Sequence, residues 1–255
     1  MIRLKTKEEI ETMREGGKRL AEVLEKVSKK VKPGVSSLEL DRYAREIIEG
    51  FGDKPSFLNY QPKGIRFPYP FSTCLSVNDE IVHGLPKANK IFREGDLLGI
   101  DIGLIHKGLF LDSAITVPVG KVDYNAMEMI AVTKQALEIG ILEAKIGNTV
   151  GDIGFAIEQY IKEFKYGIVR DLAGHGVGFA VHEEPFVPNF GKRGQGEKLV
   201  EGLVIAIEPM VNEGKGAMIL DSDGQTYRTK DGKRSAHFEH TIAITKDGPM
   251  VLTQK

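Results

Sequence analysis

The chain has 255 residues, with 35 Lys and Arg against 36 Asp and Glu, and its net charge of −1 argues against a nucleic-acid or membrane surface as the main partner. A single cysteine excludes an internal disulfide and favours a reducing, cytoplasmic location. No apolar run reaches the 18 residues typical of a membrane-spanning helix, and the charged first residues do not resemble a signal peptide.

Two amphipathic helices are predicted at the start of the chain. Thr6-Lys7-Glu8-Glu9 is a capping box, in which a Thr and the Glu three residues later satisfy free backbone groups at a helix start. Apolar residues follow at helical spacing through residues 10–27, and Pro33-Gly34 ends this helix. A second helix is expected over residues 37–48.

The stretch 97–117 predicts a β-hairpin, because two apolar, β-branched runs flank a turn-like Ile-His-Lys-Gly sequence. With the turn centred between His106 and Lys107, Asp101 and Asp112 would lie directly opposite each other. Opposed like charges destabilise a sheet and Asp is a poor strand former, so a cation must compensate or one carboxyl must stay protonated. We interpret the pair as metal ligands and His106 as a surface residue of the turn.

A second copy of this pattern follows later in the chain. The sequence before each hairpin contains Val-His-x-x-Pro, and helices expected over residues 125–144 and 151–164 repeat the earlier helix pair. The matched positions are Asp101 and Glu208, Asp112 and Glu239, and His83 and His182. We therefore predict a mixed α/β fold of the α+β type. It forms a single domain over 1–255, in two similar halves of about 1–120 and 121–255, with the carboxylates at the centre of the sheet.

Four carboxylates and one imidazole are candidate metal ligands, namely Asp101, Asp112, His175, Glu208 and Glu239. Because they carry more charge than one divalent ion needs, we expect two ions about 3.5–4 Å apart. Oxygen-rich ligation with one nitrogen suits cobalt, manganese, iron, zinc or nickel, and the sequence does not choose among them. The Gly-x-Gly-x-Gly around His175 is not a dinucleotide loop, because residues 181–185 break any following helix.

Together these motifs resemble the type I methionine aminopeptidases of bacteria. The matching residues are Asp101, Asp112, Gly174-His175-Gly176, Ile207-Glu208-Pro209 and Phe238-Glu239-His240-Thr241, with His83 and His182. The resemblance covers essentially the whole chain and implies the pita-bread fold. It also implies a cytoplasmic monomer that removes the initiator methionine from nascent proteins and peptides, preferably before a small residue. The ribosome is a candidate partner, and neither nucleic acid nor a membrane is expected as one.

The resemblance also implies a role for each matched residue. It makes the five candidate ligands a dimetal site in which Asp112 and Glu239 bridge the ions. Glu208 would transfer a proton to the leaving amine, His182 would polarise the scissile carbonyl, and His83 would lie beside the amide nitrogen. The remaining matches are Tyr69 and Cys74, which fall on positions that form the methionine pocket.

Four features depart from the family pattern. Val181 and Gln225 stand where aromatic residues are common, the Gly/Pro-rich loop 60–68 is longer than usual, and His237 replaces a glutamine. A less covered pocket predicts appreciable cleavage of norleucine and weaker cleavage of leucine, and Val181→Phe is expected to sharpen selectivity. Because His237 shares a face with Glu239, we expect it to orient His182 or a bridging carboxylate without binding metal.

Two alternative functions stay open at this point. An Xaa-Pro aminopeptidase or prolidase shares the fold and the ligands, although such enzymes normally carry an extra N-terminal domain for which we expect no room here. A non-catalytic peptide-binding module of the same fold would have lost metal ligands, whereas all five stand in this chain. Incubation of the metal-loaded protein with Met-Gly and Xaa-Pro peptides would distinguish the three.

Overall fold

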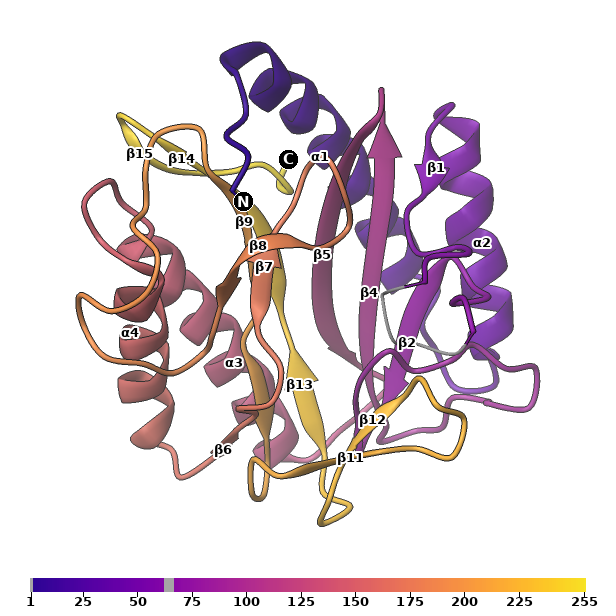
Figure 1. The fold of residues 1–255 in the computed structure, drawn as a ribbon. Helices are drawn as coiled ribbons and strands as arrows, with labels where there is room; N and C mark the ends of the chain where they lie inside the picture. Colours follow the sequence, from indigo (N-terminus) through magenta and orange to yellow (C-terminus); the bar gives the residue numbers. More distant parts are fainter. Residues whose placement is uncertain (1, 62–66) are drawn as a thin grey trace.

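A nine-stranded antiparallel sheet forms the centre of the protein, and four helices pack in two pairs beside it (Figure 1). The computed structural model describes residues 2–61 and 67–255. The helices are α1 (Lys7–Ser28), α2 (Ser37–Gly50), α3 (Tyr124–Glu143) and α4 (Val150–Lys162). No helix in the described ranges is long and apolar enough to cross a membrane.

The large sheet follows the order β1-β4-β5-β14-β9-β7-β8, with β2 added to β4 and β15 added to β14. Its strands are β1 (Lys54–Pro55), β2 (Thr73–Val77), β4 (Leu97–His106), β5 (Leu109–Pro118), β7 (Gly174–Gly176), β8 (Glu183–Val187), β9 (Val204–Ile207), β14 (Glu239–Thr245) and β15 (Gly248–Val251). Two three-stranded sheets complete the fold, in the orders β13-β10-β6 and β11-β12-β3. Their strands are β3 (Glu80–Val82), β6 (Gly167–Ile168), β10 (Met210–Asn212), β11 (Met218–Leu220), β12 (Tyr227–Thr229) and β13 (Ser235–His237). The predicted α+β class and pita-bread fold are confirmed, while the division into two repeated halves stays a prediction.

The capping boxes fix where the first two helices begin. In α1 the Thr6 hydroxyl accepts from the Glu9 amide, while the Glu9 carboxylate accepts from the Thr6 amide at 2.8 Å. Ser36 and Glu39 make the same reciprocal pair before α2. Both starts match the prediction, because a capping box is a local signal that tertiary packing does not need to supply.

The two helix pairs define two apolar cores. The first core joins α1 and α2 to β2, β4 and β5, through fully buried residues such as Leu20, Leu40 and Ile100. The second joins α3 and α4 to β9 and β14, through residues such as Ile157 and Ile205. Both cores hold the central strands in place, so the carboxylates on those strands sit on a rigid support.

The hairpin of β4 and β5 is confirmed, but its turn lies one residue later than predicted. The turn residues are Lys107 and Gly108, whose φ angles of 49° and 85° suit a two-residue hairpin turn. Asp101 therefore lies opposite Ala114, and Asp112 is its diagonal neighbour on the same face. The prediction of directly opposed aspartates was wrong. Both turn positions have positive φ, and Gly108 adopts it without strain as the second turn residue.

The prediction of His106 as a surface residue was also wrong. Its side chain is 2% exposed, with Nδ1 2.7 Å from Asp53 Oδ1 and Nε2 3.2 Å from Glu15 Oε2. Helix α1 packs over this end of the hairpin, where a Cβ added at Gly16 would lie 2.6 Å from His106 Cβ. This burial is a tertiary effect that the local turn sequence does not reveal.

Candidate active site

Four carboxylates meet on one face of the central strands. Asp101 on β4 and Glu239 on β14 both lie opposite Ala114 of β5, one on each side, and Asp112 lies two residues along β5. Opposed residues and residues two apart share a face, so all three carboxylates project together over the Ala114 methyl group. Glu208 directly follows β9, and continuing the pairing of His240 with Ile207 places it beside Glu239.

Burial of these carboxylates is unfavourable without a cation. Asp101, Asp112 and Glu239 are at most 8% exposed, and one oxygen of each has no hydrogen-bond partner among the described residues. Each such buried, unpaired oxygen costs about 1–3 kcal/mol. Burial raises the pKa of Asp101 to about 6 and raises the pKa values of Asp112 and Glu239 well above their usual range. A bound cation would reverse these shifts by stabilising the ionised form.

The imidazole of His175 completes the set of donors. Its Nδ1 lies 2.9 Å from the Gly176 carbonyl oxygen, which only accepts, so the ring carries its proton on Nδ1. The lone pair on Nε2 is then available to bind a metal ion. Ligand atoms of Asp112, His175 and Glu239 all lie within 4.8 Å of one another. Buried oxygens without partners beside a correctly oriented imidazole nitrogen fit a divalent metal ion.

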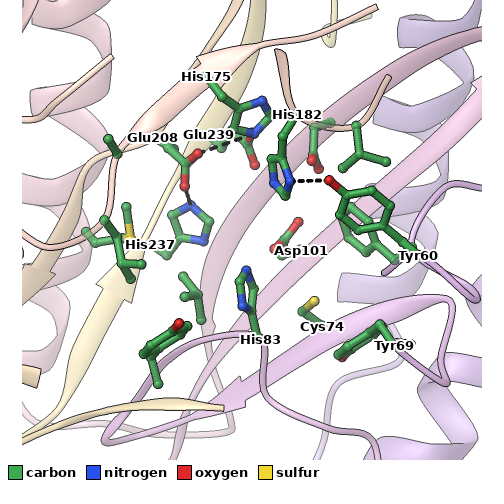
Figure 2. Close-up of a pocket in the computed structure, with 18 of the residues that line it drawn as sticks. Tyr60, Tyr69, Cys74, His83, Asp101, His175, His182, Glu208, His237 and Glu239 are labelled. Atoms are coloured by element: carbon green, nitrogen blue, oxygen red, sulfur yellow. Dashed lines mark hydrogen bonds and ion pairs between the residues drawn. The ribbon is translucent and has the colours of Figure 1, made fainter. Parts of the chain in front are cut away.

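Glu208 lies between two imidazoles. Its Oε1 is 3.5 Å from His175 Nε2, and its Oε2 is 3.3 Å from His237 Nε2 (Figure 2). His237 was expected to orient His182 or a bridging carboxylate, and this role stays a prediction. Its Nε2 faces Glu208. The sequence identified its face but not this neighbour, because β13 pairs with β10, which follows Glu208 in the chain, only in the tertiary structure.

A cavity of about 710 Å³ opens beside the carboxylates, and the remaining predicted residues line it. Figure 2 shows the rings of His83 and His182 projecting into this space from different sides. His83 has a φ of 57° and an edge contact with the Tyr227 ring at 5.7 Å between centroids. Burial lowers the pKa of His83 to about 4, so its imidazole is neutral at physiological pH.

The predicted methionine pocket lies along one wall of this cavity. Tyr69 and Cys74 are buried there and pack with Val181, and Phe57 is a fourth buried member of the same apolar cluster. Tyr60, which is partly buried, packs against it. Sequence analysis missed both aromatic residues, and their position in the aromatic-rich stretch 50–73 was the available signal.

The other departures from the family pattern also lie near the cavity. Gln225 lines it and donates from Nε2 to the Phe67 carbonyl oxygen at 3.0 Å. This contact ties the turn before β12 to the end of the loop that was predicted to be longer than usual. Residues 62–66 of that loop lie outside the described part of the chain.

Known proteins match this chain in sequence and in fold over nearly its full length. The model of metallopeptidase family M24 matches residues 11–246. A methionine aminopeptidase of Aquifex aeolicus is 46% identical over 99% of both chains, and methionine aminopeptidase 1 of Bacillus subtilis is 42% identical over 100% of both. The crystal structure of the Thermotoga maritima methionine aminopeptidase has a TM-score of 0.95 and 41% identity, with complete coverage of both chains. A prolidase of Pyrococcus furiosus shares the fold, with a TM-score of 0.75, 24% identity and coverage of 65% of that chain.

Proposed function

The chain belongs to metallopeptidase family M24 and its activity is that of a methionine aminopeptidase; from this premise we propose how its site carries out the reaction. We propose that Asp101, Asp112, His175, Glu208 and Glu239 would hold two divalent ions. The support is a set of four carboxylates and one imidazole, buried except for the partly exposed Glu208, which is too highly charged for one ion. When bound, such ions polarise a carbonyl group and make water nucleophilic at neutral pH.

The side chains around the ligands orient the substrate and transfer the proton. Glu208 is the proposed proton carrier, since its carboxylate lies between His175 and His237 and borders the cavity. His182 would donate a hydrogen bond to the scissile carbonyl oxygen, and neutral His83 would lie beside the leaving amide nitrogen. Such proton transfer contributes about 10²–10⁴ in rate.

The apolar wall of the cavity would bind the methionine side chain. Phe57, Tyr69, Cys74 and Val181 provide a buried apolar surface for a long, unbranched and polarizable group. One methylene changes binding in such a pocket by only about 1–3 kcal/mol, so norleucine should be accepted and leucine cleaved more weakly. A small residue after the methionine is expected to be preferred.

We further propose that the protein acts in the cytoplasm as a monomer on the N-termini of nascent proteins and peptides. A near-neutral net charge and a single buried cysteine support this setting. Transient contact with the ribosome would supply nascent chains.

The observation that carries the proposal is the convergence of the five predicted ligands at one cavity. The test incubates manganese- or cobalt-loaded protein with a Met-Ala peptide and an Xaa-Pro peptide and measures released amino acids and bound metal. Asp112→Asn should abolish methionine release and remove about one equivalent of metal, whereas Asp247→Asn, at an exposed turn carboxylate, should change neither. Full activity of Asp112→Asn with two ions still bound would contradict the ligand assignment. Cleavage of the Xaa-Pro peptide alone would indicate the prolidase-type activity instead.

A further inference from the structure

Two neighbouring imidazoles in the cavity have different partners on the same ring atom. The rings of His175 and His182 meet edge to face, with centroids 4.4 Å apart. Nδ1 of His175 faces a backbone carbonyl oxygen, whereas Nδ1 of His182 lies 2.8 Å from the hydroxyl oxygen of Tyr60 (Figure 2). Because the partner of one ring nitrogen determines which nitrogen carries the proton, the two rings need not share a tautomer.

The direction of the hydrogen bond between Tyr60 and His182 follows from its surroundings. A phenol hydroxyl has one proton to donate and can also accept. If the hydroxyl donates to Nδ1, its proton is used, and the imidazole proton lies on Nε2. In the reverse direction the phenol proton would have to pass to solvent, since within residues 2–61 and 67–255 the hydrogen bond of this hydroxyl is with His182. Donation by Tyr60 therefore pairs the phenol proton within the protein and leaves the Nε2 proton of His182 for the cavity.

The backbone around Tyr60 is held firmly enough to fix the ring. Its amide donates to the Phe57 carbonyl at 2.9 Å, and its carbonyl accepts from the Tyr69 amide at 2.8 Å. The Asn59 amide donates in turn to the Tyr69 carbonyl at 2.8 Å. The Tyr60 ring packs on the apolar cluster and lies 5.3 Å from the His182 ring. This position depends on contacts between described residues on both sides of the loop.

We propose that Tyr60 is a positioning residue that holds His182 with its proton on Nε2, directed into the cavity. The proposal rests on the function proposed above, in which His182 donates to the scissile carbonyl oxygen. With the proton on Nδ1 instead, the Nε2 lone pair would face that oxygen and repel it. His175 has the opposite tautomer, so one imidazole is available to a cation and its neighbour to the substrate.

The tautomer can be read directly by NMR. In ¹⁵N-histidine-labelled, metal-free protein at pH 7.5, long-range ¹H–¹⁵N correlations distinguish Nδ1–H from Nε2–H rings, and His182→Gln identifies the His182 signals among the six histidines. We expect an Nε2–H pattern for His182 in the parent protein and a mixture of tautomers in Tyr60→Phe. An Nδ1–H pattern in the parent protein, or an unchanged spectrum in Tyr60→Phe, would overturn the proposal.

Kinetics give a second readout on the metal-loaded enzyme with a Met-Ala peptide. Tyr60→Phe should lower kcat about tenfold with KM within about twofold, because a hydrogen bond to a developing oxyanion acts mainly in the transition state. Tyr166→Phe is the matched control, since it removes a partly buried hydroxyl that donates to Glu128 Oε2 at 2.7 Å, and it should keep the parent kcat. An unchanged kcat in Tyr60→Phe would refute the positioning role. A parent enzyme that releases no methionine would contradict the proposed function, while the NMR result would still decide the tautomer.

Discussion

Replacing Lys5 by methionine should destabilise the protein, although Lys5 lies far from the metal ligands in sequence. The Lys5 side chain is 1% exposed, and its Nζ lies 2.7 Å from Glu183 Oε2, on a side chain that is 12% exposed. The other oxygen of Glu183 accepts from the amides of Phe179 and Ala180, so the pair ties the N-terminal segment to the loop that precedes His182. Methionine keeps the length and apolar stem of Lys5 but removes the charge.

The expected loss follows from the environment of the carboxylate left behind. Removing one partner of a buried ion pair costs about 3–5 kcal/mol. Glu183 keeps two amide donors and slight exposure, so the lower end of this range, about 3 kcal/mol, applies. For a protein of this size the melting temperature should fall by about 6–12 °C.

Urea unfolding followed by circular dichroism measures the change as a lower midpoint with an unchanged slope. Lys7→Met, at an exposed lysine two residues later, is the control and should shift stability by less than about 0.5 kcal/mol. The double variant Lys5→Met/Glu183→Gln should recover at least half of the loss, because no buried charge then remains unpaired. A loss below about 1 kcal/mol in Lys5→Met, or additive losses in the double variant, would refute this reasoning.

Three further predictions concern the cavity. Because Phe57 already packs against Val181, Val181→Phe alone should overpack the wall and cost about 1–3 kcal/mol in thermal stability. The double variant Phe57→Ala/Val181→Phe should recover stability and raise the methionine-to-leucine ratio of kcat/KM. A single variant as stable as the parent protein would contradict this prediction. His237→Gln should keep the bound metal and most activity, because an amide nitrogen can take the place of the His237 Nε2, which lies 3.3 Å from Glu208 Oε2 without a hydrogen bond. Complete loss of bound metal would instead identify His237 as a ligand. Metal-free protein should lose stability as pH rises from about 4 to about 6, because Asp101, whose pKa is raised to about 6, binds a proton more tightly when folded than when unfolded. Metal-loaded protein should not follow this trend. Melting temperatures that change with pH in the same way for both forms would contradict the argument.

Local signals predicted much of the fold correctly. The capping boxes at Thr6 and Ser36 define helix starts within a single turn of backbone, and two apolar, β-branched runs around a turn-like sequence defined the central hairpin. The hairpin register was harder, because the choice between two turn positions depends on which residue adopts positive φ. The short strands β6 and β10–β13 were not predicted, since two or three residues carry too little periodicity to be recognised.

The site was predictable to the extent that its residues are chemically unusual in strands. Four acidic residues in buried-looking runs identify themselves, since such positions normally exclude charge. His106 and Tyr60 illustrate the opposite case. A histidine in a turn and a tyrosine before a loop are ordinary in sequence, and their partners Asp53, Glu15 and His182 come from segments that only folding brings together.

The position of Asp101 and Glu239 on either side of Ala114 has a mechanical consequence. Two adjacent inter-strand spacings separate their backbones by about 10 Å, and hydrogen bonds between strands maintain that distance. The two carboxylates start on opposite sides of a single residue, so the separation of their backbones is set by the sheet rather than by a bound ion. If ions of different radius bind as proposed, small rotations of the carboxylates would accommodate them while the sheet keeps its shape.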